Sequence, residues 1–401
     1  MDKYTAESMA REISSEVDKI KVNMSQLNMM VIGKTGAGKS TLINGMFGEN
    51  LAPTGTGFPV TMEVGSYSKN NYPFIIMDWP GFELDGDNSI EVQFDEIKKV
   101  ITLGNKTKKP QNMIHCVLYC VSATGHRFED AEIDFIKKLL AETGKNKIPV
   151  ILVITQAFMK KDTLALKENI EELELPFADV VPVLVHDMDL GDYVKKAYGM
   201  DRLAAAIGQL INDDLKNTLE CVQQVNMKMM TRRANMYING NAAKAGALGL
   251  KPLFRKKDIY PIVIKTLASI STVYDIDVRP EFIEAVPQLI EESGEVEIKQ
   301  NKILNVVRFL EPTVYLANSA IVGAQAGAVI TSLGGVYLKY MNLISLKEMT
   351  ADELEPERLV EEFNERFIAT LKRDKKKRDE DNHDNLKRDD KKHNKRGEKH
   401  E

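Results

Sequence analysis

A glycine-rich segment near the start of the chain carries residue types that can hold the phosphates of a nucleotide. Residues 33–40 read Gly-Lys-Thr-Gly-Ala-Gly-Lys-Ser and follow the apolar run 29–32. Glycines let consecutive backbone N–H groups turn inward around an anion, the lysine can reach the terminal phosphates, and the serine hydroxyl can ligate Mg²⁺. Residues 41–47 read as the opening of a helix whose positive end would face those phosphates. The residues predicted to bind the nucleotide here are Gly33, Lys34, Thr35, Gly36, Ala37, Gly38, Lys39, Ser40 and Thr41.

A second motif supplies a carboxylate. Asp78-Trp79-Pro80-Gly81 closes the apolar run 74–77 and fits the Asp-x-x-Gly element of GTPases. In that element the aspartate holds Mg²⁺, through water, and the glycine N–H contacts the γ-phosphate. Thr61 stands immediately before a strand candidate, where a metal-contacting threonine is expected, with Thr54 and Thr56 as alternatives. The predicted metal residues are therefore Ser40, Thr61 and Asp78, and the predicted catalytic residues are Lys39, Thr61 and Gly81.

Both motifs need a scaffold that brings them to one edge, and the apolar pattern predicts such a scaffold. Over residues 26–215, short apolar runs alternate with helix-length amphipathic segments. This alternation predicts an α/β fold with a mostly parallel sheet, helices on both faces, and the ligand at the carboxyl ends of the strands. The predicted strands are Met29–Ile32, Glu63–Ser68, Phe74–Asp78, Met113–Ser122, Ile148–Gln156 and Val180–His186, and the predicted helices are Lys39–Phe47, Ile90–Leu103, Asp130–Glu142, Leu164–Glu172 and Met200–Leu219.

Residues 33–40, Thr61 and residues 78–81 together resemble the Era-like branch of the translation-factor class of P-loop GTPases. The resemblance covers residues 26–215 and implies a G-domain fold, GTP as substrate and Mg²⁺ as cofactor. It implies hydrolysis to GDP and phosphate by a nucleotide-dependent switch. The segment Gly57-Phe58-Pro59-Val60-Thr61 is also similar, more distantly, to immunity-related GTPases.

The base-reading element of that family, Asn/Thr-Lys-x-Asp, is incomplete in this sequence. The matching stretch is Thr155-Gln156-Ala157-Phe158, and Thr155 and Gln156 are the residues predicted to contact the nucleotide. Phe158 cannot accept a hydrogen bond, and Asp162 lies four residues later. Loss of a charged hydrogen-bond partner weakens base discrimination by about 1.5–3 kcal/mol. Guanine specificity and a relaxed specificity that admits ATP therefore both stay open.

The resemblance also implies slow intrinsic turnover. Ras-type enzymes have a glutamine after the Asp-x-x-Gly glycine that orients the attacking water, and Phe82 occupies that position here. Arg127, after the fourth predicted strand, could supply positive charge, although a surface arginine that begins the next helix is the favoured interpretation. The water-positioning group is left unassigned.

The remainder of the chain reads as helical. Residues 216–345 are similar to the small-residue-rich domain of unknown function that follows some bacterial Era-like GTPases. No charged residue lies between Glu311 and Lys339, and Gly323 and Gly327 form a small-xxx-small pattern that allows close helix approach. The favoured interpretation is a buried helix or helical hairpin. The alternative is a membrane-docking, self-assembling GTPase of the dynamin-like or immunity-related kind. Residues 1–25 are predicted as an N-terminal helix, 26–215 as the GTPase domain, 346–371 as an acidic helix and 372–401 as a disordered charged tail.

Composition and charge limit the kinds of partner that we expect. The 401 residues carry a net charge of −5 with mixed signs, so nothing global indicates nucleic acid. The three cysteines form no disulfide framework, and Cys116 and Cys120 are predicted as buried small hydrophobes on one side of a strand. The polar N-terminal residues lack the apolar core of a signal peptide, so we expect a cytoplasmic protein. The expected partners are a guanine nucleotide, a nucleotide-dependent second copy and a membrane surface. A non-enzymatic scaffold with a structural nucleotide remains a further alternative.

Overall fold

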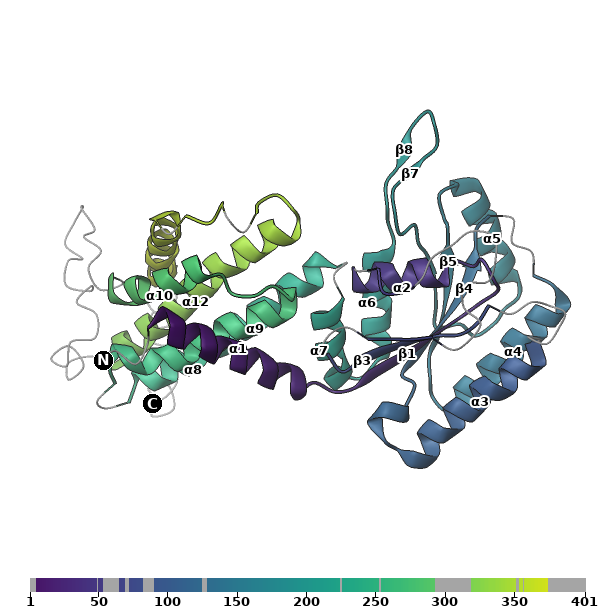
Figure 1. The fold of residues 1–401 in the computed structure, drawn as a ribbon, viewed down its shortest axis with the longest axis horizontal. Helices are drawn as coiled ribbons and strands as arrows, with labels where there is room; N and C mark the ends of the chain where they lie inside the picture. Colours follow the sequence, from purple (N-terminus) through teal and green to yellow (C-terminus); the bar gives the residue numbers. More distant parts are fainter. Residues whose placement is uncertain are drawn as a thin grey trace, which may run out of the picture. The chain divides into compact units, whose positions relative to one another are not determined.

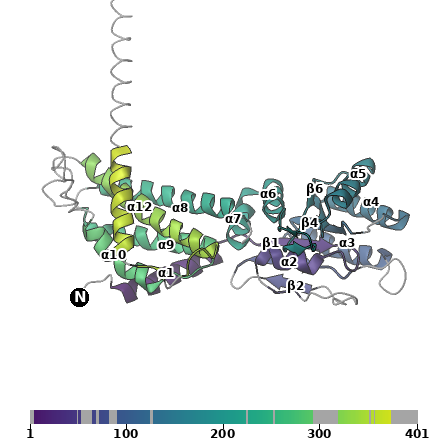
Figure 2. The ribbon, with the colours of Figure 1, turned by 90° about the horizontal axis from the view of Figure 1, so that it is seen from above.

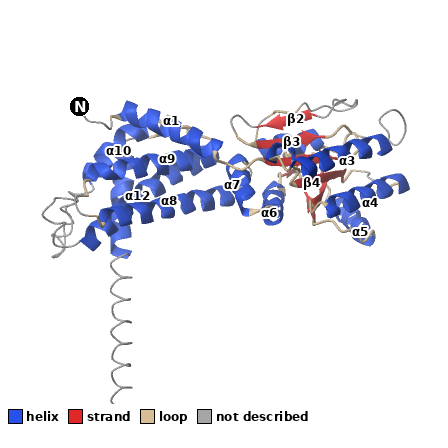
Figure 3. Ribbon diagram, turned by 90° about the horizontal axis from the view of Figure 1, so that it is seen from below, coloured by secondary structure: helices blue, strands red, loops and turns tan. Residues whose placement is uncertain are grey.

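The computed structural model describes most of the chain as two compact units. One unit consists of residues 18–230, and the other combines residues 1–17 with residues 231–401. Strands occur in the first unit, and the described elements of the second are helical (Figure 3). The described residues are 5–48, 50–52, 65–68, 72–81, 90–124, 128–223, 226–251, 254–292, 319–350, 353–355 and 357–373.

The first unit is built on a mostly parallel sheet, as the alternating pattern predicted. In the described residues the strand order is β2-β3-β1-β4-β5-β6, with β2 antiparallel to β3 and the other neighbours parallel. β2 and β6 lie at opposite edges of the sheet (Figure 2). The strands are β1 Leu27–Ile32, β2 Gly65–Ser68, β3 Phe74–Asp78, β4 Cys116–Ser122, β5 Val150–Thr155 and β6 Asp179–Pro182.

Helices cover both faces of this sheet (Figure 1). Three of them, α3, α4 and α5, pack their apolar sides with alternate residues of β1, β4 and β5 in one buried cluster. The intervening strand residues, such as Met29 and Val31, are also fully buried, because α2, α6 and α7 lie on the other face. The helices of this unit are α2 Lys39–Phe47, α3 Ile90–Thr107, α4 Asp130–Lys145, α5 Lys160–Glu172, α6 Met200–Leu210 and α7 Asp213–Val222.

The predicted helix Met200–Leu219 is wrong, because the chain breaks between α6 and α7. Ile211 is extended and buried, and Asn212 begins the new helix from an extended conformation. The predicted strand Val180–His186 is also too long, since β6 ends at Pro182. A hairpin of β7 Met188–Asp189 and β8 Val194–Lys195 follows it and was not predicted.

The second unit is a helical assembly in which small residues bring two helices close together. A Cβ atom added at Gly323 would lie 2.7 Å from the carbonyl oxygen of Gly246, and one added at Gly249 would lie 2.9 Å from the Cα of Gly323. The close approach that the small-xxx-small pattern allows is therefore present. The helices are α1 Ala6–Val22, of which residues up to 17 belong to this unit, α8 Met227–Gly249, α9 Tyr260–Tyr274, α10 Pro280–Glu292, α12 Ser319–Ser345 and a helix over residues 357–373.

The helix over residues 357–373 packs on α12 through both apolar and charged groups. Its apolar side chains Leu359, Phe363 and Phe367 are buried, and Glu362 accepts hydrogen bonds from Lys339 (2.6 Å) and Tyr340 (3.2 Å) of α12. No helix in the described part of the chain is sufficiently long and apolar to cross a membrane. Residues 312–318 of the uncharged stretch, and residues 374–401 of the tail, lie outside the described residues.

Two glycine-to-alanine changes should have opposite effects on this unit. Gly323→Ala would force the backbones of α8 and α12 apart, so we expect a loss of about 1–3 kcal/mol in stability. Gly240→Ala, on an open face of α8 where the new Cβ meets nothing within 4 Å, should stabilise the helix by about 0.5–1 kcal/mol. Thermal unfolding followed by far-ultraviolet circular dichroism measures both variants. Equal midpoints for the two would contradict the close packing of the helices.

Candidate functional site

The glycine-rich loop lies at the carboxyl edge of the sheet, between β1 and α2. Gly33 rests against β4 so closely that an added Cβ would lie 2.3 Å from the carbonyl oxygen of Cys120. Gly36 and Gly38 have φ angles of 77° and 76°, in the left-handed region that favours glycine. The residue that precedes α2 is Gly38, which has no side chain to cap the helix, so the first N–H groups of α2 are available to an anion. The backbone therefore has the form of a phosphate cradle.

Lys39 lies inside this loop and is 7% exposed. Its Nζ donates hydrogen bonds to the carbonyl oxygens of Gly33 (3.0 Å) and Lys34 (3.2 Å). Burial lowers the pKa of this ammonium, while the Asp78 carboxylate acts to raise it. A buried cation held by two neutral carbonyls is poorly compensated, so an incoming phosphate would improve its environment.

Asp78 and Ser40 form an oxygen pair at the end of β3. The Ser40 hydroxyl donates to Asp78 Oδ2 at 3.3 Å, and burial raises the pKa of the carboxyl against the opposing charge of Lys39. Asp78 is fully buried, and its Oδ1 has no hydrogen-bond partner among the described residues. An unpartnered carboxylate oxygen beside a hydroxyl suits Mg²⁺, which binds through one or two carboxylates plus substrate phosphates. These residues therefore fit the cation.

The third predicted metal residue, Thr61, lies outside the described residues, as do its alternatives Thr54 and Thr56. The same holds for Phe82 and Arg127. In the part of the chain that the structure describes, no three His, Cys, Asp or Glu residues gather as a metal cluster. The roles of these residues stay predictions.

Gly81 brings the Asp-x-x-Gly motif against the glycine-rich loop. A Cβ added at Gly81 would lie 2.5 Å from Thr35 Oγ1 and 2.6 Å from Thr35 Cα. Any side chain at position 81 would therefore push the two segments apart. Trp79, two residues before Gly81, is the single tryptophan of the chain and is buried.

Thr155 and Gln156 hold the loop from β5. The Thr155 hydroxyl lies 2.7 Å from the carbonyl oxygen of Ala37 and 3.1 Å from that of Val121 on β4. Gln156 Nε2 donates to the carbonyl oxygen of Gly36 at 3.1 Å, and its Oε1 accepts from Ser122 at 3.0 Å. Both residues were predicted at the site, but in this structure their polar atoms clamp the loop.

The side chains beyond Gln156 offer little to a base. Phe158 is half-buried, and Asp162 is exposed in the first turn of α5. Tyr198 donates from its hydroxyl to the carbonyl oxygen of Ala157 at 2.7 Å and so ties this loop to the end of the β7–β8 segment. Neither Tyr198 nor Glu132 of α4 was predicted from the sequence. No spacing rule could have found them, because each contacts a segment far away in the sequence.

The two buried cysteines of β4 agree with the sequence prediction. Cys116 and Cys120 are almost fully buried, and burial raises the pKa of each thiol to about 12. Neither thiol is a reactive nucleophile near neutral pH.

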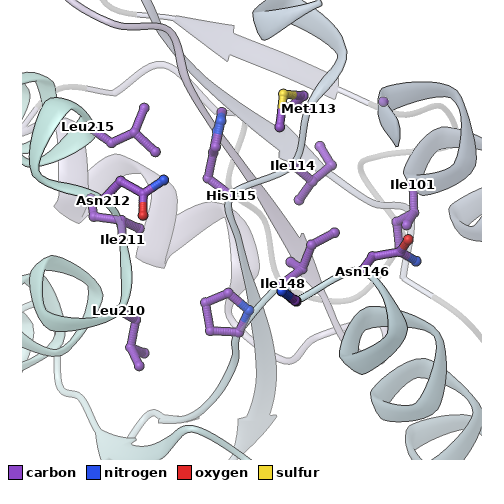
Figure 4. Close-up of a pocket in the computed structure, with 13 residues that line it drawn as sticks. Ile101, Met113, Ile114, His115, Asn146, Ile148, Leu210, Ile211, Asn212 and Leu215 are labelled. Carbon is purple, nitrogen blue, oxygen red and sulfur yellow. The ribbon is translucent and has the colours of Figure 1, made fainter. Parts of the chain in front are cut away.

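A separate small cavity of about 150 Å³ lies at the amino ends of β4 and β5 (Figure 4). His115 and Pro149, which precede β4 and β5, line it together with Asn212 of the α6–α7 junction. His115 Nδ1 accepts from the backbone N–H of Asn28 at 3.0 Å, and burial lowers the pKa of the imidazole. None of the predicted site residues that the structure describes lines this cavity, so it is distinct from the phosphate cradle.

A known protein family also matches the part of the chain that carries the glycine-rich loop. Residues 28–156 match the family described as "50S ribosome-binding GTPase". The first unit is therefore a G domain, the nucleotide-binding fold of P-loop GTPases.

Two relatives are septins. Neuronal-specific septin-3 of Danio rerio is 30% identical over 194 residues, which are 41% of this chain and 51% of the relative. Human septin-12 is 24% identical over 220 residues, 49% of this chain and 61% of the relative. The chain thus spans about half the length of the curated relatives it matches.

Two solved structures are also similar. Aquifex aeolicus Era bound to GDP and AlF4⁻ is 23% identical over 47% of this chain and 58% of that chain, with a TM-score of 0.33. Toc33 of Arabidopsis thaliana in complex with GDP and Mg²⁺ is 17% identical over 53% of this chain and 92% of that chain, with a TM-score of 0.33.

The clamp at Thr155 can be tested without a nucleotide. Thr155→Val removes the hydroxyl from two buried carbonyls and should cost about 1–3 kcal/mol in unfolding free energy. Thr155→Ser keeps the hydroxyl and loses one methyl group, at a cost of about 0.8 kcal/mol. Urea unfolding followed by Trp79 fluorescence reports on this unit. Equal losses for the two variants would show that the hydroxyl does not hold the loop.

Proposed function

We propose that this protein binds GTP with Mg²⁺ and hydrolyses it to GDP and phosphate, as a nucleotide-dependent switch of the Era-like kind. The observation that supports this most is the pairing of two incompletely compensated groups at the edge of the G domain. Among the described residues, the buried ammonium of Lys39 donates to two carbonyl oxygens and lies within the field of Asp78, whose Oδ1 has no partner there. A magnesium–triphosphate carries the two charges that would satisfy both groups.

Each residue then has a distinct part in the proposed site. The N–H groups of the glycine-rich loop and of the first turn of α2 bind the phosphate oxygens. Lys39 neutralises the negative charge that develops on oxygens of the terminal phosphates as the phosphoryl group is transferred. Ser40 and Asp78, with Thr61 as predicted from the sequence, would hold Mg²⁺, which would supply positive charge to stabilise the phosphates. Gly81 senses the γ-phosphate through its N–H.

The switch would act through two loops, 49–61 and 78–84. Gly81 already lies against Thr35 of the phosphate loop, so a γ-phosphate entering there would act directly on the second loop. With Phe82 in place of a water-orienting glutamine, we expect slow turnover unless a partner contributes a group.

A nucleotide-dependent second copy and a membrane surface are the two proposed macromolecular partners. Sedimentation of the full chain with a non-hydrolysable GTP analogue, with and without anionic liposomes, separates them. A larger sedimenting species without lipid supports self-association, and pelleting only with lipid supports docking. We further propose a cytoplasmic location, in keeping with the free, buried thiols of Cys116 and Cys120.

Lys39→Ala tests the phosphate site. Loss of a charged hydrogen-bond donor should weaken GTP binding by about 10- to 100-fold, the equivalent of 1.5–3 kcal/mol. The matched control is Lys160→Ala, since Lys160 is an exposed lysine at the start of α5. Titration with a fluorescent GTP analogue measures both variants. Undiminished binding by Lys39→Ala would overturn the assignment.

A second candidate function is nucleotide hydrolysis with relaxed base specificity. Two observations favour it. The Gln156 side-chain amide already hydrogen-bonds to Ser122 and to the carbonyl of Gly36, and the side chain at position 158 is apolar. No carboxylate stands at the position where the family reads guanine.

Phe158→Asp should therefore create a preference for guanine. A carboxylate at this position accepts hydrogen bonds from guanine alone, so the ratio of ATP to GTP dissociation constants should rise by about 10- to 100-fold. Phe158→Leu, which stays apolar, should leave the ratio unchanged. Competition of ATP and GTP against a fluorescent nucleotide gives both ratios. A strong GTP preference in the unaltered protein would remove the second candidate.

A further inference from the structure

A charge network centred on a buried carboxylate lies beside the glycine-rich loop. Lys34 Nζ is 2.8 Å from Glu132 Oε2 of α4, and 3.6 Å from Glu129 Oε1. The hydroxyl of Tyr119 on β4 donates to the other carboxylate oxygen, Glu132 Oε1, at 2.9 Å. The Glu132 side chain is 1% exposed and Tyr119 is fully buried. Loop, helix and strand therefore meet at one carboxylate.

Such a network is not explained by stability alone. Removing a carboxylate from water is costly, and a buried ion pair often stabilises a protein no more than apolar side chains of the same volume would. Burial and the adjacent Glu132 charge raise the pKa of Tyr119 well above its usual range, so the phenol remains a donor at all physiological pH values. What the network provides is a fixed position for each of its members.

Lys34, whose position the network fixes, also contacts Lys39 of the candidate site. While the Lys34 side chain pairs with Glu132, its main-chain carbonyl oxygen accepts a hydrogen bond from Lys39 Nζ at 3.2 Å. One residue thus connects α4 to the ammonium that we assign to the phosphates. A shift of the Lys34 side chain would move one of the two carbonyls that hold Lys39.

The loop needs this support, because its own sequence does not define its shape. Gly36 and Gly38 are left-handed and have no side chains with which to pack. Residues outside the loop hold its later part. The Thr155 hydroxyl bonds to the carbonyl of Ala37, and the Gln156 amide bonds to the carbonyl of Gly36. The pair with Glu132 is the corresponding clamp on its first part.

We propose that Glu132 is a positioning residue, which acts through Lys34 to set the main chain of the glycine-rich loop and thereby the place of Lys39. This inference rests on the proposed function only in assigning Lys39 to nucleotide phosphates. Glu132 itself touches no phosphate. Its effect is preorganisation of the empty loop, which lowers the cost of ordering the loop when a nucleotide binds.

Glu132→Gln tests this in the full chain with two readouts. The variant keeps the shape of the side chain and removes its charge, so GTP affinity should fall by about tenfold. In nucleotide-free protein the backbone amides of residues 33–40 should exchange with deuterium faster than in the unaltered chain. Glu129→Gln is the matched control, because it removes an exposed carboxylate 3.6 Å from Lys34 Nζ and should keep both readouts near the unaltered values.

A double-mutant cycle tests whether Glu132 acts through Lys34. Lys34→Met alone should weaken affinity about as much as Glu132→Gln, and the combined variant should be no worse than either one, since both changes break the same pair. Losses that add in the combined variant would overturn the proposal.

A matched core variant separates positioning from general destabilisation. Phe135→Leu lies on the same helix and alters a ring that packs beside Tyr119, with the ring centroids 6.3 Å apart. It should lower the unfolding midpoint while leaving affinity and loop exchange unchanged. An equal loss of affinity in Phe135→Leu would show that the role of Glu132 is only structural.

The two proposals fail in different ways. If the unaltered chain binds no nucleotide, the proposed function is wrong, and loop exchange in the empty protein still tests Glu132. If the chain binds GTP but Glu132→Gln changes neither affinity nor exchange, the positioning role is wrong and the function stands.

Discussion

The constraint on which this structure depends is that a loop whose turns are made by glycines must keep one shape. Glycine gives residues 33–38 access to left-handed backbone, and the same freedom makes the loop costly to order. The shape is therefore imposed by neighbours. The carbonyl of Cys120, the hydroxyl of Thr155, the backbone at Gly81 and the ion pair of Lys34 each act on a different part of it. These contacts exist because β1, β3, β4 and β5 are parallel and end at one edge of the sheet.

The same edge concentrates charges that the fold does not neutralise. Lys39 and Asp78 are both buried, and burial opposes the charged form of each. Their mutual attraction relieves this only in part, as the unpartnered Oδ1 of Asp78 shows within the described residues. Groups held in this way are characteristic of functional sites, where a ligand completes the compensation.

The helical unit illustrates a simpler relation between sequence and packing. Glycines on α8 and α12 lie so close that either backbone would clash with a side chain on the other. This contact was foreseeable from the small-xxx-small spacing, because the spacing places small residues on one face of a helix. The partner helix was not foreseeable, since several segments of the chain carry small residues.

The sequence by itself determined the elements and motifs whose information is local. The parallel sheet, the bounds of β3 and α2, and the burial of Cys116 and Cys120 follow from apolar periodicity over a few residues. The break at Ile211 and the β7–β8 hairpin did not follow, because an amphipathic pattern continues across the break and two-residue strands are too short to give one.

Only the tertiary structure decided which polar groups meet. It committed the Gln156 amide to the loop and away from a base, left Asp162 exposed, and joined Glu132 to Lys34. A motif can specify the atoms that touch a ligand, because those atoms lie within a few residues of each other. The groups that hold a motif in place come from other strands and helices, and their positions depend on how the whole sheet is assembled.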